Sequence, residues 1–551
     1  MASRDPLMKR RGFLGAIGAM AGAPLLQGCA PELAPSLPPG RLLGDAPALG
    51  HRLRGGSAEP LPAPGETRRI PVLIVGGGIG GLAAGWKLAR SGFDDFLLLE
   101  MADESGGNSR GLGTAAGPCP LAAHYLPLPG VEALAVRELL AELGVLQDDP
   151  RALRPTYDER YLCAVPQERL YRDGLWQEGL WPQIGASASD RGQYARFQEL
   201  MNAYRDRRAF TVPMAYSKRS PELLALDRVS MRDWLLAQKL DSAPLHWYVD
   251  YACRDDYGTA SAETSAWAGI HYFACRSGEA ANAEHDTVLT APDGNAWLAR
   301  GLERGITSRS AGRIVNGALA FRVEQTRRAV LIDVFFPAEG RSVRYEAAQL
   351  IWAAPLFPVP RVFVGEPRLA DAARQYSHAP WLVANLVVTH LPVASAGAPL
   401  AWDNVLYGSP GLGYVVSTHQ QMRLADAGAV LTYYRALAGV SPAAGRESLL
   451  ARSREAWLDE VFADLGRAHA ELRSLTVAAD VIRLGHAMAR PTVGFVWGGA
   501  REAFAADSPR LRFAHADVSG FSIFEEAQYR GVLAAERTLR RLGVRFTSSL
   551  V

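Results

Sequence analysis

Three glycines and one acid near the start of the chain have the types and spacing of a nucleotide-binding loop. Gly76, Gly78 and Gly81 form G-x-G-x-x-G, and Glu100 follows nineteen residues after the last of them. The glycines of such a loop allow a tight turn, close backbone approach to a pyrophosphate and close helix packing. The acid accepts hydrogen bonds from ribose hydroxyls. A carboxylate at this place would also repel a 2′-phosphate, which argues against NADP.

The surrounding sequence supplies the elements that must position this loop. Val72–Val75 and Phe96–Leu99 are short apolar runs, typical of strands buried in a parallel sheet. Apolar residues at helical spacing follow the glycines, and Gly80 lies in the first turn of the predicted helix. The start of that helix would offer N–H groups and partial positive charge to a phosphate. Strand, glycines, helix, strand and acid in register favour a dinucleotide site over a Gly-rich turn that binds nothing.

Two further segments indicate which dinucleotide is bound. Directly after Glu100 the chain reads MADESGGNSRG, and residues 511–539 read LRFAHADVSGFSIFEEAQYRGVLAAERTL. The second segment predicts an apolar strand that ends near Asp517 and a helix that begins near Phe524. Together with the N-terminal glycines, these segments resemble the flavin-containing amine oxidase superfamily, which includes phytoene-desaturase-like enzymes.

The resemblance implies an α/β fold in which a Rossmann-like FAD-binding domain of the glutathione-reductase type is interleaved with an α+β substrate domain. It implies FAD as the cofactor. Gly107 and Arg110 would line the pyrophosphate, and Asp517 would bind the ribityl chain. The backbone of Ala311 would contact the adenine, and the backbone of Phe524, at a helix N-terminus, would face the pyrimidine edge of the flavin.

The chain departs from the family pattern at four places. Arg110 stands two positions later than the usual arginine, and Glu526 occupies a position often taken by glycine. No cysteine follows Cys275, which excludes the C-terminal cysteinyl flavin attachment of some relatives and predicts non-covalent FAD. No lysine follows Lys239, whereas many amine oxidases of the family hold a lysine near the flavin. This favours a dehydrogenase that passes electrons to an unidentified acceptor over an efficient oxidase.

The candidate catalytic residues are His486 and Trp497, which precede the C-terminal flavin segment. His486 could act as acid, base or orienting donor, or could be a structural histidine. Trp497 could stack in the cleft or fill the core. Residues 247–258 and 266–276 concentrate aromatic and charged side chains, but at helical spacing aromatic residues are more typical of a core than of a substrate cage.

The expected reaction is oxidation of the C–N bond of a small amine by hydride transfer. Two other classes stay open. A desaturase-like flavoenzyme acting on an apolar C–C bond would share every nucleotide motif, but it needs a long apolar tunnel. A non-catalytic protein that retains flavin would share them too.

The expected domain organisation interleaves two folding units. Residues 69–130, 276–360 and 481–551 would form the FAD-binding domain. Residues 131–275, largely helical, and residues 361–480, rich in strands, would form the substrate domain. Such an arrangement predicts a cleft at the flavin face.

The N-terminus has the pattern of an export signal rather than of a folded segment. Residues 1–28, with Arg10 and Arg11 before a short apolar stretch, resemble a twin-arginine signal and are too short and mild for a spanning helix. Leu26 to Cys29 resembles a lipobox, so Cys29 would become a lipid anchor unless the signal is simply cleaved nearby. Eight prolines then predict an unstructured tether over residues 29–68. The expected location is the periplasm, free or membrane-anchored.

Composition limits the remaining partners and cofactors. The 551 residues are 48% hydrophobic with a formal net charge of +2, which is typical of a globular protein of two or three domains and does not predict nucleic-acid binding. The spacings of Cys119, Cys163, Cys253 and Cys275 match no metal site. These thiols could stay free and buried, or Cys253 could pair with Cys275.

Overall fold

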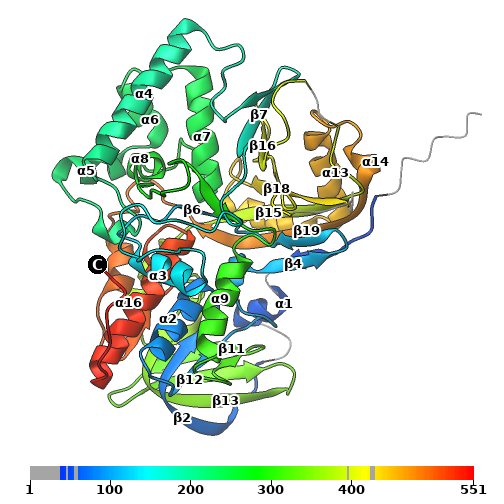
Figure 1. Ribbon diagram of the computed structural model, residues 1–551. Coiled ribbons are helices and arrows are strands. Elements are labelled where there is room, and N and C mark those ends of the chain that lie inside the picture. Colours follow the sequence, from blue (N-terminus) through cyan, green and yellow to red (C-terminus); the bar gives the residue numbers. More distant parts are fainter. Residues whose placement is uncertain (1–36, 45–46, 55–59, 394–395, 422–427) are drawn as a thin grey trace, which may run out of the picture. The chain divides into compact units, whose positions relative to one another are not determined.

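The computed structural model describes residues 37–44, 47–54, 60–393, 396–421 and 428–551. Arg10, Arg11 and Cys29, on which the export and lipid-anchor predictions rest, lie outside these ranges. The described chain forms two eight-stranded mixed sheets, each with its own helices (Figure 1).

The first sheet carries the nucleotide-binding loop. Its order is β10-β3-β2-β13-β12-β11-β14, with β20 paired to β13. Its strands are β2 (Pro64–Val75), β3 (Phe96–Leu99), β10 (Ile314–Val315), β11 (Leu319–Gln325), β12 (Val330–Phe336), β13 (Arg341–Trp352), β14 (Phe363–Val364) and β20 (Leu511–Phe513). The neighbours β10, β3, β2 and β13 run parallel, as does β20 beside β13. Their C-terminal ends therefore meet at one edge, where ligands bind in such sheets.

Three helices pack together on this sheet: α2 (Ile79–Arg90), α9 (Ala296–Thr307) and α16 (Phe524–Leu542) (Figure 1). The helices α2 and α16 approach closely because glycines lie at their contact. A Cβ added to Gly531 would stand 2.2 Å from the carbonyl oxygen of Gly80. Only a residue without a side chain fits there.

The second sheet belongs to the expected substrate domain. Its order is β1-β19-β15-β18-β17-β16-β7-β8. Its strands are β1 (Leu42–Gly44), β7 (Glu168–Arg172), β8 (Leu175–Glu178), β15 (His378–Val388), β16 (Asp403–Leu406), β17 (Tyr414–Val416), β18 (Ala429–Ala436) and β19 (Thr476–Ala489). All eleven residues of β15 are buried. Helices such as α13 (Arg454–Leu465) cover one face of this strand, and segments that include parts of the expected FAD-binding domain pack against the other face. Strands β7 and β8 come from residues 131–275, whose other elements are helices.

Helices between residues 188 and 274 lie together beside the second sheet (Figure 1). They include α4 (Ala188–Asp206), α6 (Met231–Ala237), α7 (Ala243–Tyr257) and α8 (Ala266–Ala274). Serine caps fix where three of them begin: Ser187, Ser230 and Ser242 accept hydrogen bonds from backbone N–H groups in the first turn. The ends of α7 and α8 then deliver Asp255, Asp256 and Arg276 to one place.

The prediction of an unstructured tether over residues 29–68 is wrong for its described part. Strand β1 pairs in parallel with Val481–Arg483 of β19, and β2 already begins at Pro64. Arg41 donates to Asp480 at 2.6 Å, and Gly40 lies so close to β19 that a Cβ would meet the carbonyl oxygen of Ala479 at 1.9 Å. A proline-rich composition does not prevent a short stretch from adding to a sheet edge.

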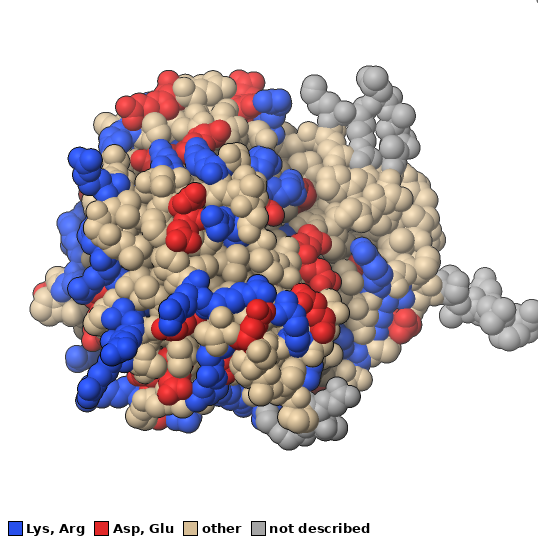
Figure 2. Space-filling model, turned by 90° about the horizontal axis from the view of Figure 1, so that it is seen from below, with Lys and Arg blue, Asp and Glu red and all other residues tan. Residues whose placement is uncertain are grey.

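Three further observations concern the described residues. The thiols of Cys119, Cys163, Cys253 and Cys275 are free and buried, so Cys253 and Cys275 form no disulfide. No helix within the described ranges is long and apolar enough to cross a membrane. Figure 2 shows a face with many Lys and Arg side chains among which Asp and Glu side chains are interspersed.

Candidate active site

The glycines of the loop divide into packed and open positions. A Cβ at Gly81 would lie 1.8 Å from the carbonyl oxygen of Gly76, and one at Gly80 would lie 2.0 Å from that of Ala514. Gly76 has φ +106° and abuts Ala353 and Ala354. A Cβ at Gly78, in contrast, would meet no atom within 4 Å. This open position stands at the uncapped N-terminus of α2, where a pyrophosphate would approach the backbone.

Glu100 and Gly107 lie beside this open position. The Glu100 carboxylate accepts hydrogen bonds from the backbone N–H of Gly77 at 2.6 Å and of Ala102 at 2.8 Å. Gly107 has φ +57°, and a Cβ there would lie 3.3 Å from the Cα of Gly78. Arg110 donates from Nε to the carbonyl oxygen of Gly107 at 3.0 Å and so holds this loop. The glycines, Glu100, Gly107 and Arg110 thus gather around the N-terminus of α2, an arrangement that fits a dinucleotide and that we call the dinucleotide groove.

Ala311 does not join this group. The register of β10 with β3 pairs Val315 with Leu99, so Ala311 is level with the start of β3, while Asn316 is level with Glu100. Ala311 is also exposed in a turn. The residues of this segment that are level with Leu99 and Glu100 are Val315 and Asn316, so Ala311 lies away from Glu100.

Asp517 is buried at the turn between β20 and α16. Its carboxylate is 1% exposed, and its Oδ2 accepts hydrogen bonds from Leu356 N–H and from His378 Nε2, both at 3.0 Å. Burial alone would raise its pKa, but the nearby His515 and His378 hold the pKa well below its usual range. The other oxygen, Oδ1, has no hydrogen-bond partner among the described residues, and the carboxylate does not line the cavity described next. Its role toward the ribityl chain stays a prediction.

A large cavity lies between the groove, the second sheet and the helices α7 and α8. Its walls enclose about 1220 Å³ of space not filled by protein atoms, open solvent at the mouth included. Residues Asn108 and 122–130 form one wall, and residues 521–525, with Phe524, form another. The N-terminus of α16 has no side-chain cap, so its backbone N–H groups are available to a ligand in this cavity.

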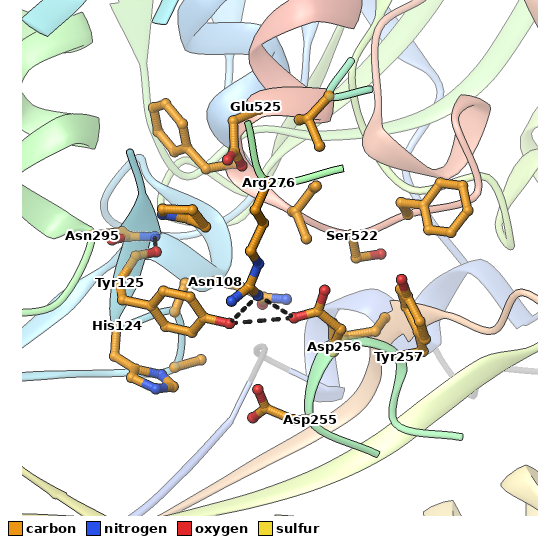
Figure 3. A pocket seen from close by; sticks show the side chains of 18 of the residues that line it. Asn108, His124, Tyr125, Asp255, Asp256, Tyr257, Arg276, Asn295, Ser522 and Glu525 are labelled. Atoms are coloured by element: carbon orange, nitrogen blue, oxygen red, sulfur yellow. Dashed lines mark hydrogen bonds and ion pairs between the residues drawn. The ribbon is translucent and has the colours of Figure 1, made fainter. Parts of the chain in front are cut away.

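Charged side chains converge inside the cavity (Figure 3). Arg276 donates to the hydroxyl of Tyr125 at 3.0 Å and reaches Asp256 at 3.5 Å, and Tyr125 donates to Asp256 at 3.3 Å. Asp255 lies next to this triangle, outside its hydrogen bonds (Figure 3). Glu525, at the start of α16, is 5% exposed. Three carboxyls and one guanidinium give this space an excess of negative charge when the carboxyls are ionised.

Burial raises the pKa of all three carboxyls and keeps two of them, Asp255 and Glu525, close to half-ionisation near neutral pH. It raises the pKa of Asp255 to about 7, and the neighbouring Asp256 adds to the rise. It also raises the pKa of Glu525 to about 7. The pKa of Asp256 is raised by burial as well, while Arg276 and Tyr125 act against the rise. A group with such a pKa exchanges a proton readily at pH 7.

Aromatic side chains form the walls around the carboxyls. His124 stacks on Tyr434 with ring centroids 4.4 Å apart, and burial lowers the pKa of His124 to about 4, so its imidazole is neutral. The Tyr434 hydroxyl donates to the carbonyl oxygen of Ala122 at 2.9 Å. Trp381 and Tyr257 complete the lining. Flat aromatic faces next to carboxylates form a typical environment for an organic cation.

Neither predicted catalytic residue lies in this cavity. Residues 485–487 of β19 stand opposite Pro380 alone, because Met488 pairs with Ala379 and Leu484 with Trp381. This bulge leaves Leu484, Ala487 and Met488 on the cavity wall, while His486 lies in a second pocket, stacked on Phe357. Trp497 packs edge-on against Trp267 in the core of the helical part.

Sequence reasoning identified the segments that hold Asp255, Asp256 and Arg276 but interpreted their aromatic residues as core. These aromatic residues belong to the core and also line the cavity. Tyr257 and His271 are 1% and 2% exposed and still face the cavity. The adjacent pair of acids at the end of an aromatic helix was the signal that could have identified the site.

Comparisons with known proteins identify chains that share the fold. The model of the NAD(P)-binding Rossmann-like domain matches residues 74–143. No curated protein sequence matches the chain. Putrescine oxidase bound to putrescine aligns with 85% of this chain and 99% of its own, at 15% identity and a TM-score of 0.60.

Two other solved structures show the same arrangement. Cyclohexylamine oxidase from Brevibacterium oxydans aligns with 86% of this chain and 99% of its own, at 16% identity and a TM-score of 0.61. A fatty acid isomerase from P. acnes aligns with 85% and 98%, at 13% identity and a TM-score of 0.57. The predicted fold class is therefore confirmed: the chain has the fold of these oxidases, a Rossmann-like domain interleaved with an α+β domain.

Proposed function

We propose that this protein is an FAD-dependent oxidoreductase that oxidises the C–N bond of a small amine. The observation that carries the proposal is the placement of Asp255 and Asp256 among aromatic walls, across from the uncapped N-terminus of α16. An ammonium group is attracted to the carboxylates and to the aromatic faces, whereas the start of α16 favours the electron-rich edge of a flavin. The fold that the chain shares with two amine oxidases supports this reading.

The dinucleotide groove fits FAD. Gly78 leaves the space that a pyrophosphate needs, Glu100 supplies the acceptor for ribose hydroxyls, and the N-terminus of α16 supplies donors for the flavin ring. When bound, FAD would supply the acceptor for the hydride that leaves the substrate carbon.

The side chains of the cavity would bind and orient the amine. Asp256, held by Tyr125 and Arg276, keeps a fixed position and can attract the ammonium group. Asp255, with a pKa of about 7, can accept the ammonium proton at its carboxylate oxygen, which leaves the neutral amine that hydride loss requires. The aromatic walls exclude water around the substrate carbon.

The enzyme would work as a dehydrogenase with another electron acceptor rather than as an efficient oxidase. The lysines of the described ranges, Lys87, Lys218 and Lys239, do not line the cavity. Lys87 donates to Thr547 and Ser549, and Lys218 donates to Arg207. A lysine near the flavin, as many oxidases of the resembling family have, is thus missing from this part of the chain.

The test is the visible spectrum of the purified protein during anaerobic addition of an amine series. We expect a yellow protein whose absorbance bleaches with one class of primary or secondary amine. Bleaching by an unsaturated lipid instead would favour the desaturase-like alternative, and no bleaching by any metabolite would favour a flavin-retaining binding protein. After reduction, slow recovery in air and fast recovery with a dye acceptor would support the dehydrogenase.

Export through the twin-arginine route, with a lipid anchor at Cys29, is the second part of the proposal. The support is the sequence alone: Arg10 and Arg11 before a short apolar stretch, then Leu26 to Cys29. Replacing both arginines by lysine should keep the precursor in the cytoplasm, and Cys29→Ser should release the protein from membranes. Normal delivery of the lysine variant to the periplasm would contradict the route.

A further inference from the structure

A second, strongly polar pocket lies on the other side of β19 from the large cavity. It lies between α10 (Val359–Val362), the end of α11 (Pro367–Arg374), the start of β15, α12 (Pro442–Ala451) and the β19 bulge. The basic residues that line it are Arg361, Arg374, His378, Arg446 and His486. None of the described residues that line this pocket is acidic.

The positive charge of this pocket is poorly neutralised. Arg446 donates only to the backbone carbonyl of His378, at 3.3 Å, and the Arg361 guanidinium makes no hydrogen bond or ion pair within the described ranges. Arg374 pairs with Asp371 at 2.6 Å, but both side chains are largely exposed. Asp517, behind His378, is buried and does not line the pocket, and its Oδ2 accepts hydrogen bonds from Leu356 and His378.

Burial and neighbouring positive charges lower the pKa of two basic residues in this pocket. Burial lowers the pKa of Arg446, and the charge of Arg54 lowers it further. Burial also lowers the pKa of His486 to about 3, with contributions from His378, Arg446 and Arg54, so its imidazole is neutral at pH 7. Like charges gathered in a pocket destabilise the fold unless an anion joins them.

We propose that this pocket is a binding site for a compact anion that carries a phosphate group. Arg361 and Arg446 approach from two different helices, and their planar guanidinium groups match the oxygens of a phosphate in pairs. The His486 ring is held by stacking on Phe357, with centroids 4.0 Å apart, and can donate one hydrogen bond. A phosphate carries more charge than a single carboxylate and is the better match for several cations.

This site is separate from the dinucleotide groove. Gly78, Glu100 and Gly107, which define the groove, do not line the pocket, and the pocket shares none of its lining residues with the large cavity. The β19 bulge turns Leu484 and Met488 toward the cavity and His486 toward the pocket. The pocket can therefore be filled while the cavity binds its own ligands.

The experiment titrates the full purified protein with inorganic phosphate at constant ionic strength, set with sodium chloride, and measures the dissociation constant by calorimetry. The variants are Arg361→Gln, whose exposed side chain has no folding role, and Arg446→Gln. Arg322→Gln, an exposed arginine paired with Glu324 on β11, is the matched control. We expect each pocket variant to weaken phosphate binding at least tenfold and the control to leave it unchanged.

A second titration with vesicles of phosphatidic acid distinguishes the source of the phosphate group. Binding of inorganic phosphate would identify a free anion as the ligand of the pocket. Binding of the vesicles alone, if it is lost in Arg361→Gln, would identify a lipid headgroup as the ligand. Equal binding by all variants, or no binding by the unchanged protein in either titration, overturns the proposal. Loss of flavin from Arg446→Gln, with competition between phosphate and FAD, also overturns it, because the pocket would then be part of the dinucleotide groove.

Discussion

Single carboxylates carry most of the chemistry proposed for the large cavity, and Asp255 is the one whose charge changes near neutral pH. Its pKa of about 7 means that it attracts a cation or accepts a proton only above that pH. We expect kcat/KM for an amine to rise between pH 6 and 8. In Asp255→Asn this rise should disappear, and kcat/KM at pH 8 should fall about tenfold or more, as for loss of one charged hydrogen bond.

The same residue gives a stability signature with a definite sign. In the folded state Asp255 keeps its proton up to about pH 7, whereas in the unfolded chain it loses it near pH 4. Its contribution to stability is therefore present below pH 4 and decreases as the pH rises to 7. Asp255→Asn should have a higher Tm than the unchanged protein at pH 8, while Asp173→Asn, exposed in the β7–β8 turn, should not. A lower Tm for Asp255→Asn at pH 8 would contradict the buried, destabilising charge.

A substitution of Glu100 tests whether the dinucleotide groove binds FAD. Its removal would take a charged acceptor from the ribose, worth roughly 1.5–3 kcal/mol per hydrogen bond. Glu100→Ala should lose flavin on extensive washing, measured by the ratio of visible to ultraviolet absorbance. Glu104→Ala, four residues later and exposed, is the control and should keep its flavin. Equal flavin content in both variants would mean that Glu100 only accepts hydrogen bonds from the backbone of Gly77 and Ala102 and does not bind the ribose.

At the scale of an element, two glycines at the start of α2 are expected to have different roles, one in ligand binding and one in folding. Gly78→Val adds its side chain to open space with φ −69°, a conformation that valine adopts, so the protein should fold but not retain flavin. Gly81→Val would force a side chain against the carbonyl oxygen of Gly76 and should lower the Tm or prevent folding. The two variants are compared by Tm and by colour. A yellow Gly78→Val protein would show that the ligand lies elsewhere.

Elements also explain which predictions succeeded. The βαβ unit with its glycines and Glu100 is local in sequence, and its pattern predicted both strands and the helix correctly. The distance of Ala311 from Glu100 follows from the register between β10 and β3, which no local pattern contains. The position of His486 outside the large cavity follows from a bulge opposite Pro380, which the sequence does not indicate either. Asp255 and Asp256 lie at the end of α7, where helical periodicity does not distinguish a core from a cavity wall.

At the scale of the whole molecule, a buried ion pair joins the nucleotide-binding domain to the end of the chain. Lys87 of α2 lies 3.3 Å from Glu536 of α16 and donates to Thr547 and Ser549. Lys87→Met would leave Glu536 buried without this partner, and we expect the free energy of unfolding to fall by about 3–5 kcal/mol. Lys218→Met, on the surface, is the control. Denaturant titration measures both, and an unchanged midpoint for Lys87→Met would contradict a stabilising pair.

Strand β1 has a consequence for how copies of this protein meet in solution. Residues 39–44 occupy the outer side of β19 along residues 479–483, and at the opposite end of the sheet Trp176 of β8 exchanges backbone hydrogen bonds with Ala396 and Ala398. Within the described residues, both rims of this sheet are thus covered over part of their length, which limits the free ladder that a second copy could extend. Cleavage that removed residues 37–44 would uncover the fourteen-residue β19, with buried Val481 and Ile482, and turn this rim into a template for intermolecular strand addition and aggregation.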